Sequence, residues 1–266
     1  MKQRVISGVF IVLITLAAVL LSGYFFIALC AFIDIWGCKE VIDLRKDKKF
    51  SIPLYLTMLA STLLISSDIL FFDINIQLIT LLIELIVLLS IAVFDEEVSF
   101  LDCSCIFLMS VIIGFGTFFF MYFENISKYL FAYVIIISYV TDACAYFVGS
   151  MLGKHKLNER ISPKKSIEGF IGGWLLGGII SLLFAYLFKF FYMPEIVIII
   201  GSLTLPLLSQ IGDLIFSMIK RFYDVKDYSN LIPGHGGLLD RLDSLLITSL
   251  FLGAICLVLV WKDYCY

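Results

Sequence analysis

Charge is scarce in this chain of 266 residues, because only 15% of them are Asp, Glu, Lys or Arg. Hydrophobic residues make up 61% of the chain and the mean hydropathy is +1.05, whereas soluble domains are about 45–50% apolar. This balance excludes a soluble globule built around one buried core. It predicts a polytopic membrane protein.

A Cys-x-x-Cys pair is also lacking, although the chain has seven cysteines. Most of these thiols lie in or beside apolar runs, where cysteine behaves as a small hydrophobic residue. A zinc site is therefore not expected, and the cysteines are predicted to be structural. The sequence has no low-complexity tract and no convincing internal repeat.

Long apolar runs predict an all-α fold with about nine transmembrane helices, since each spanning helix needs about 20 mostly apolar residues. The expected ranges are 5–22, 23–38, 51–67, 75–94, 103–122, 128–149, 167–190, 195–216 and 238–261. We expect about five N-terminal membrane helices over residues 1–125. Residues 126–266 form a C-terminal membrane region that carries the polar segments.

Lysine and arginine cluster in alternate connections between these helices. The N-terminal tail, the loops at 39–49 and 154–165 and the segment 220–241 hold all of them except Lys128, Lys189 and Lys262. Because basic loops stay in the cytoplasm, this distribution predicts a cytoplasmic N-terminus and an external C-terminus.

One polar stretch, Ser217 to Asp243, stands out and reads SMIKRFYDVKDYSNLIPGHGGLLDRLD. On a helix, Asp240 and Asp243 share one face. The glycines allow close approach of the backbone to a ligand, and a helix that begins near Leu238 offers free N–H groups to an anion. Carboxylates beside Lys and Arg indicate Mg²⁺ and phosphate. The alternative is a charged loop between two membrane helices.

A second polar segment spans Thr141 to Glu168, and its Asp142 lies inside an apolar run. A carboxylate in such a position is a candidate functional residue, although it could also serve as a structural partner for a buried polar group. The spacing of Gly149 and Gly153 favours close approach of a second helix or a ligand.

Two lysines follow in the same segment. Ser162 is expected to cap a helix with Pro163 at its first position. Lys164 and Lys165 would then lie near the helix start, which is unfavourable unless an anion binds there. The alternative is an anchor for acidic lipid head groups.

The first stretch resembles the signature of phosphatidate cytidylyltransferases, also called CDP-diacylglycerol synthases. That pattern is Ser, two residues, Lys-Arg, four residues, Lys-Asp, then Pro-x-His-Gly-Gly-x-x-Asp-Arg-x-Asp. The residues in register are Ser217, Lys220, Arg221, Lys226, Asp227, Pro233, His235, Gly236, Gly237, Asp240, Arg241 and Asp243. Further matches are Thr141-Asp142, Ala145-Tyr146, Gly153-Lys154, Ser162–Lys165, Glu168-Gly169 and Gln210–Leu214. The resemblance covers roughly residues 130–260, with a departure at Ser229-Asn230.

The resemblance implies an enzyme that transfers a cytidylyl group from CTP to phosphatidic acid, giving CDP-diacylglycerol and pyrophosphate. The attacking phosphate is already an anion, so metal ions and cationic side chains are expected to bring the reactants together. The expected cofactor is Mg²⁺, with a second cation left open, and its expected ligands are Asp213, Asp240 and Asp243.

The implied catalytic residues are Asp213, Lys220, Arg221, Lys226, Asp227, His235, Asp240, Arg241 and Asp243. The implied substrate-binding residues are Asp142, Ser162, Lys164, Lys165, Glu168, Ser217, Gly236 and Gly237. The expected partners are CTP, phosphatidic acid and membrane lipids, without nucleic acid, and a homodimer is left open. The site is expected at the cytoplasmic face of a bacterial inner membrane or its equivalent.

Three other functions compete with this interpretation. A CTP-dependent lipid kinase acting on a polyprenol or diacylglycerol would use similar charge chemistry. An ion-coupled transporter would carry charges near the bilayer midplane and inverted repeats, whereas here the charges gather at one face. A non-catalytic membrane scaffold does not account for the density of the signature.

Overall fold

The computed structural model describes residues 13–15, 17, 20–21, 23–45, 51–67, 74–188, 194–232, 234 and 236–264. Only residues 13–15, 17 and 20–21 of the first predicted helix, 5–22, are among the described residues, and the rest of that prediction lies outside them. The predicted catalytic residue His235 also lies outside the described residues.

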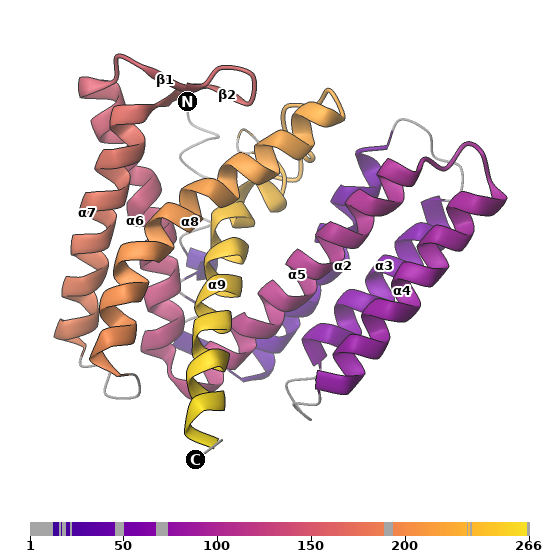
Figure 1. Ribbon diagram of the computed structural model, residues 1–266, viewed down its shortest axis with the longest axis horizontal. Coiled ribbons are helices and arrows are strands. Elements are labelled where there is room, and N and C mark those ends of the chain that lie inside the picture. Colours follow the sequence, from indigo (N-terminus) through magenta and orange to yellow (C-terminus); the bar gives the residue numbers. More distant parts are fainter. Residues whose placement is uncertain are drawn as a thin grey trace. The chain divides into compact units, whose positions relative to one another are not determined.

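Within the described residues, eight helices and two short strands have defined bounds (Figure 1). They are α2 (Tyr24–Asp43), α3 (Ser51–Ser67), α4 (Ile74–Phe94), α5 (Phe100–Ile126), α6 (Lys128–Leu152), β1 (Lys156–Asn158), β2 (Ser162–Ser166), α7 (Ile167–Leu187), α8 (Glu195–Phe222) and α9 (Leu239–Tyr264). The predicted all-α fold class is confirmed, with one small hairpin as an addition.

Six of the described helices, α4 to α9, are long and apolar enough to cross a membrane. α3 is apolar but has only 17 residues. An integral membrane protein is therefore confirmed. The count of nine spans and the sides on which the termini lie stay predictions.

The chain groups into two compact units. The first unit contains the described residues up to Asn125 together with Phe222–Arg241, and the second contains Ile126–Arg221 and the described residues from Leu242 onward. Residues 222–241 thus group with the N-terminal helices, although α8 precedes them in the sequence. The division expected from the sequence, 1–125 and 126–266, places this segment in the C-terminal region, and that division stays a prediction.

In the first unit, a carboxylate joins three helices. Asp34 on α2 is fully buried, and it accepts hydrogen bonds from Ser66 on α3 and from Thr117 on α5, each at 2.8 Å. Because a buried polar group is costly without partners, these two hydroxyls explain how the carboxyl group is accommodated among apolar helices.

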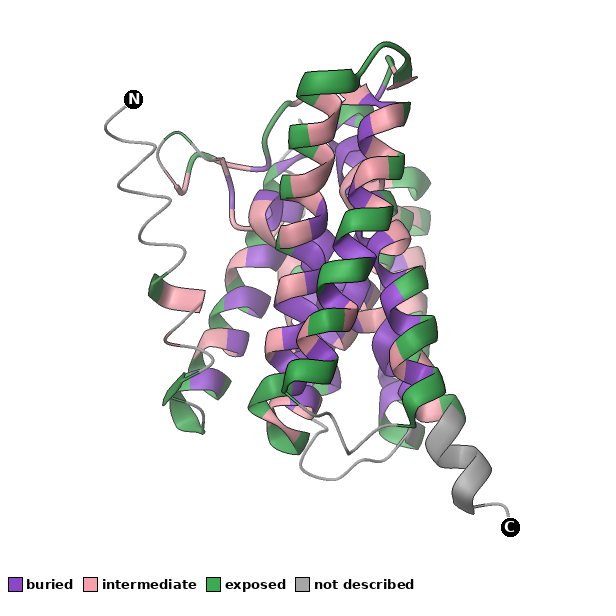
Figure 2. Ribbon diagram, turned by 90° about the vertical axis from the view of Figure 1, so that its left-hand side faces the viewer, coloured by how far each residue is buried: buried purple, intermediate pink, exposed green. Residues whose placement is uncertain are grey.

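In the second unit, α6 and α7 pack through small residues. These residues recur every four positions on both helices: Thr141, Ala145 and Gly149 on α6, and Gly169, Gly173 and Gly177 on α7. A Cβ atom added at Gly173 would lie 2.7 Å from Ala145 Cβ, and one at Gly169 would lie 3.0 Å from Gly149 Cα. The backbones are therefore as close as small residues allow. Figure 2 shows buried and exposed segments, in purple and green, alternating along the helices, so that individual helices have a buried and an exposed side.

The hairpin lies at one end of α6 and α7 (Figure 1). Its strands are antiparallel, with Lys156 opposite Ser166 and Asn158 opposite Ser162. The prediction that a helix begins at Ser162 was wrong, because β1 pairs with these residues and the helix starts four positions later. Ser166 is the N-cap of α7, and its hydroxyl accepts a hydrogen bond from the Gly169 N–H at 3.1 Å.

Candidate active site

Three carboxylates gather in the second unit, each from a different helix. Asp142 lies on α6, Asp213 on α8 and Asp243 on α9. The side chains of Asp213 and Asp243 are in hydrogen-bonding contact, and Asp142 is close enough to affect Asp243 electrostatically. Asp243 is only 8% exposed. Carboxylates this close repel one another unless positive charge lies near them.

Two lysines supply positive charge within the same unit. The Lys165 ammonium on β2 forms an ion pair with the Asp213 carboxylate. Lys220 on α8 is only 7% exposed and interacts electrostatically with both Asp213 and Asp243. The sequence-predicted residues Asp142, Lys165, Asp213, Lys220 and Asp243 are thus brought together.

Hydroxyl groups extend this cluster. Ser217 donates a hydrogen bond to Asp213 at 3.3 Å. Ser244, which sequence analysis missed, donates to Asp142 Oδ2 at 3.4 Å. The backbone N–H of Ser244 also donates to Asp243 Oδ1 at 2.7 Å. Ser244 offers no signal in the sequence, since a serine beside an aspartate is common.

Helical spacing and close packing place these groups. Asp213, Ser217 and Lys220 are separated by four and three residues, so they lie on one face of α8. One position earlier, a Cβ atom on Gly212 would lie 2.8 Å from Ile247 Cβ on α9. The missing side chain therefore lets α8 and α9 approach closely beside Asp213.

The hairpin presents its two lysines differently. Successive side chains in a strand point to opposite faces, and here Lys164 is exposed whereas Lys165 is half-buried against Asp213. Arg221 Nε donates a hydrogen bond to the Ile161 carbonyl at 3.3 Å, which ties the end of α8 to the residue before β2. Ser162 starts β2 and is half-buried.

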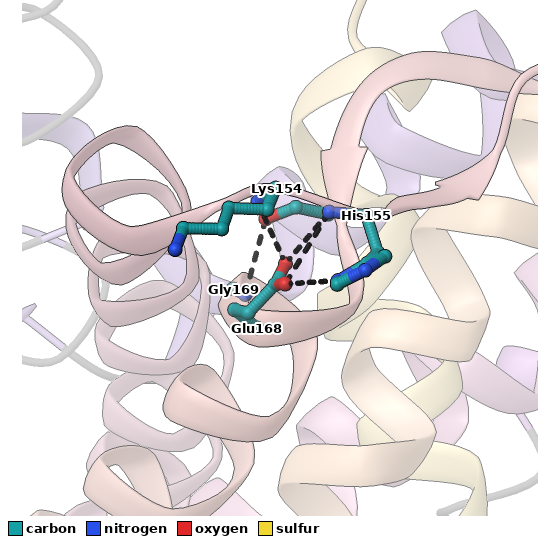
Figure 3. A network of polar contacts seen from close by, with 5 residues as sticks. Lys154, His155, Glu168 and Gly169 are labelled. Carbon is teal, nitrogen blue, oxygen red and sulfur yellow. Dashed lines mark hydrogen bonds and ion pairs between the residues drawn. The ribbon is translucent and has the colours of Figure 1, made fainter.

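Glu168 fixes the base of the hairpin (Figure 3). Its carboxylate accepts hydrogen bonds from the backbone N–H groups of Lys154 and His155, at 3.1 and 3.3 Å. The His155 ring nitrogen Nδ1 lies 2.7 Å from the same carboxylate. The Lys154 side chain points away from it in Figure 3. These contacts position the chain between α6 and β1, and a role for Glu168 in substrate binding stays a prediction.

In the first unit, Asp240 organises the loop that precedes α9. Its Oδ2 atom accepts hydrogen bonds from the backbone N–H groups of Tyr228 and Gly237, at 2.8 and 2.9 Å. Gly236 has a φ of 88°, and a pair of backbone hydrogen bonds joins it to Ile232. The left-handed backbone at Gly236 explains the need for glycine there.

The side-chain carboxylate of Glu40, on α2, lies at the beginning of α9. The sequence predicted a bound anion at this position. Its carboxylate accepts hydrogen bonds from the backbone N–H groups of Leu238 and Leu239, both at 2.8 Å, and from the Ser229 hydroxyl at 2.6 Å. Burial raises the pKa of the Glu40 carboxyl above its ordinary value, against the opposing effect of these hydrogen bonds. Glu40 was not predicted from the sequence.

Three other signature residues lie nearer the surface. Lys226 and Asp227 are exposed in the loop of the first unit, and Arg241 is half-buried in the first turn of α9. Among the described residues, no group of three or more His, Cys, Asp or Glu side chains is arranged to hold a metal ion. The set of Asp213, Asp240 and Asp243 as metal ligands therefore stays a prediction.

Comparison with known proteins places these features in a family. Residues 2–259 match the model of the Cytidylyltransferase family. The chain is 34% identical over 259 residues to the phosphatidate cytidylyltransferase of Bacillus subtilis (strain 168), covering 95% of this chain and 96% of that protein. It is 31% identical over 249 residues to the phosphatidate cytidylyltransferase of Staphylococcus haemolyticus (strain JCSC1435), covering 92% and 94%. The chain therefore belongs to the cytidylyltransferase family.

Proposed function

We propose that the protein transfers a cytidylyl group from CTP to phosphatidic acid in phospholipid biosynthesis. A phosphate oxygen of the lipid forms a bond to the α-phosphorus of CTP, and the bond to pyrophosphate breaks. The observation that carries the proposal is a cluster of charged side chains: Asp142, Asp213, Lys220 and Asp243 lie on helices long enough to span a membrane, and Lys165 joins them from β2. Relatives that cover most of the chain and are called phosphatidate cytidylyltransferases support it.

The cationic groups of the cluster suit a reaction between two anions. Lys220 is buried beside Asp213 and Asp243, and Lys165 is held by its ion pair with Asp213. Neutralising phosphate charge in a partly buried site stabilises the transition state more than it would in water. Lys165 and Lys220 are therefore the residues we assign to binding phosphate oxygens.

The carboxylate pair suits Mg²⁺ when substrate is bound. Mg²⁺ favours oxygen ligands and is commonly held by one or two carboxylates, with substrate phosphates and water completing its coordination. Asp213 and Asp243 offer such a pair, with the Ser217 hydroxyl beside them. Bound there, Mg²⁺ would neutralise charge that develops on the phosphates.

A product assay tests the function. Purified protein in detergent is incubated with phosphatidic acid and, in parallel, with diacylglycerol or a polyprenol. Each mixture contains Mg²⁺ and one of the four common nucleoside triphosphates, and the lipid products are identified by mass spectrometry. CDP-diacylglycerol and pyrophosphate, formed only with CTP, are the expected products. Transfer of a single phosphate to diacylglycerol or a polyprenol would instead identify a CTP-dependent lipid kinase.

We further propose that nine helices span the membrane, with the N-terminus and the site on the cytoplasmic side. This topology rests on the distribution of lysine and arginine. A reporter fused after Tyr266 should be external, and one inserted at residues 39–49 should be cytoplasmic. The measurement is reporter activity in whole cells, and a cytoplasmic C-terminus would contradict the count of nine.

Lys165 should matter more than Lys164, because only Lys165 contacts the carboxylate cluster. Changing Lys165 to Gln is expected to lower kcat/KM by about tenfold or more, the scale of losing a hydrogen bond to a charged group. Lys164→Gln is the matched variant, and its effect should be smaller. The measurement is initial rate against CTP and against phosphatidic acid. Equal effects of the two changes would return both lysines to a role as lipid anchors.

A further inference from the structure

The N-terminal helices contribute charged side chains to the signature segment: Asp102 on α5 accepts a hydrogen bond from the Tyr223 hydroxyl at 2.8 Å, and Glu40 on α2 makes three contacts. Glu40 lies in the last part of α2, and its hydrogen-bonding partners Ser229 and Leu239 are 189 and 199 residues away in the sequence. All of these residues belong to the first unit. The contact therefore joins α2, which carries no signature residue, to the loop before α9, which carries several of them.

Glu40 satisfies backbone groups that a helix cannot satisfy by itself. The first N–H groups of any helix lack intrahelical partners, and they carry partial positive charge. At α9 the N–H groups of Leu238 and Leu239 donate to the two oxygens of the same carboxylate. The Glu40 side chain is only 1% exposed. The carboxylate thus takes the position that a bound anion would take at this helix.

Packing reinforces the same arrangement. A Cβ atom on Gly237 would lie 2.7 and 2.8 Å from the two Glu40 oxygens, so a side chain at 237 would displace the carboxylate. One turn before Glu40 on α2, a Cβ atom on Gly37 would lie 3.3 Å from Leu239 Cδ2. The absence of a side chain at Gly37 and at Gly237 therefore allows α2 and the start of α9 to approach closely. Leu239 is fully buried in this contact.

Asp240 depends on the same loop. Its carboxylate bonds the N–H groups of Tyr228 and Gly237, which flank Ser229 and Leu238, the partners of Glu40. The carboxylates of Glu40 and Asp240 therefore bind adjacent residues at the same two places in the loop, 228–229 and 237–238. Loss of the Glu40 contacts would free Ser229 and the first turn of α9, and with them the orientation of Asp240 and Arg241.

We infer that Glu40 is a positioning residue: it fixes the signature loop and the first turn of α9 in the arrangement that cytidylyl transfer requires. The inference rests on the proposed function. Glu40 does not need to touch substrate for this role, because both of its oxygens accept hydrogen bonds from the loop and from the start of α9. Its role extends the functional part of the chain into the N-terminal helices.

Substitution at Glu40 tests the inference through turnover. Glu40→Ala removes three hydrogen bonds and is expected to lower kcat at least tenfold per folded molecule. Glu40→Gln keeps the length of the side chain but leaves only one accepting oxygen. The new NH₂ group would face one of the N–H groups that Glu40 now accepts from, so a kcat between those of wild type and Glu40→Ala is expected. Asp43→Asn, an exposed carboxylate on the same helix, is the control that should keep wild-type kcat. A kcat within twofold of wild type in Glu40→Gln and Glu40→Ala would overturn the inference.

A double-mutant cycle separates positioning from loss of folding. Gly237→Ala should lower kcat strongly beside Glu40, because the new methyl group overlaps the carboxylate. In the Glu40→Ala background the same change should lower kcat by a smaller factor, since the clash is gone. Equal effects of Gly237→Ala in the two backgrounds would mean that the residues act independently, and the inference would fail.

Amide hydrogen exchange tests the Glu40 contact without any measurement of cytidylyl transfer. Exchange at the Leu238 and Leu239 amides, followed by mass spectrometry in detergent, should be faster in Glu40→Gln than in wild type or in Asp43→Asn. Unchanged exchange would contradict the contact itself. Absence of CDP-diacylglycerol with the wild-type protein would instead overturn the proposed function, while the exchange measurement would still report on Glu40.

Discussion

Replacing Asp213 with Asn is expected to lower kcat by about two orders of magnitude, the scale of losing one stabilising group in a transition state. The substitution keeps the shape of the side chain and removes its charge. It breaks the ion pair with Lys165, and it removes the charge of one of the two side chains, Asp213 and Asp243, that we propose hold Mg²⁺. The measurement is kcat in detergent at a series of Mg²⁺ concentrations, and the apparent affinity for Mg²⁺ should fall.

Glu159→Gln is the matched control for this experiment. Glu159 lies in the connection between β1 and β2 of the same unit and is exposed, so removal of its charge should leave both kcat and the Mg²⁺ dependence near wild type. Wild-type turnover with unchanged Mg²⁺ dependence in Asp213→Asn would reject Asp213 as a metal ligand. Asp240→Asn distinguishes the two carboxylate roles: a shifted Mg²⁺ dependence would support ligation, and an unshifted one would support its role in the loop.

Replacing Gly173 with Leu is expected to prevent α6 and α7 from packing, with loss of both folded protein and activity. Even the methyl group of Gly173→Ala would lie 2.7 Å from Ala145 Cβ and 2.9 Å from the Thr141 carbonyl oxygen. Overpacking of this kind costs about 1–3 kcal/mol. Thermal unfolding in detergent should therefore begin at a lower temperature in Gly173→Ala, and further still in Gly173→Leu.

Gly201→Ala provides the matched control in the same unit. There the added methyl group meets Leu205 Cδ1 and the Tyr133 hydroxyl at 3.5 Å, which is ordinary contact. Both changes convert a helical glycine to alanine, so their effects on helix propensity are the same and the difference between them is steric. Equal melting temperatures for the two variants would contradict the proposed tight packing of α6 on α7.

The sequence by itself determined the class of the protein and much of its site. Apolar runs of spanning length predicted the membrane helices α4 to α9, because the cost of burying charge and unpaired backbone in lipid leaves few alternatives. Helical spacing alone was enough to place Asp213, Ser217 and Lys220 on a common face, since residues three and four apart are neighbours on a helix surface. The signature also indicated the family, which the relatives bear out.

Tertiary structure decided which groups meet across the fold. The pairing of β1 with β2 overrode the capping signal at Ser162, because strand pairing satisfies the backbone of residues that would otherwise have begun a helix. It also turned Lys165 toward Asp213 and left Lys164 exposed. Glu40 was missed because its partners are nearly 190 residues away or more in the sequence. Local patterns report neighbours on one element, whereas a carboxylate that caps a distant helix is defined only when the two elements pack together.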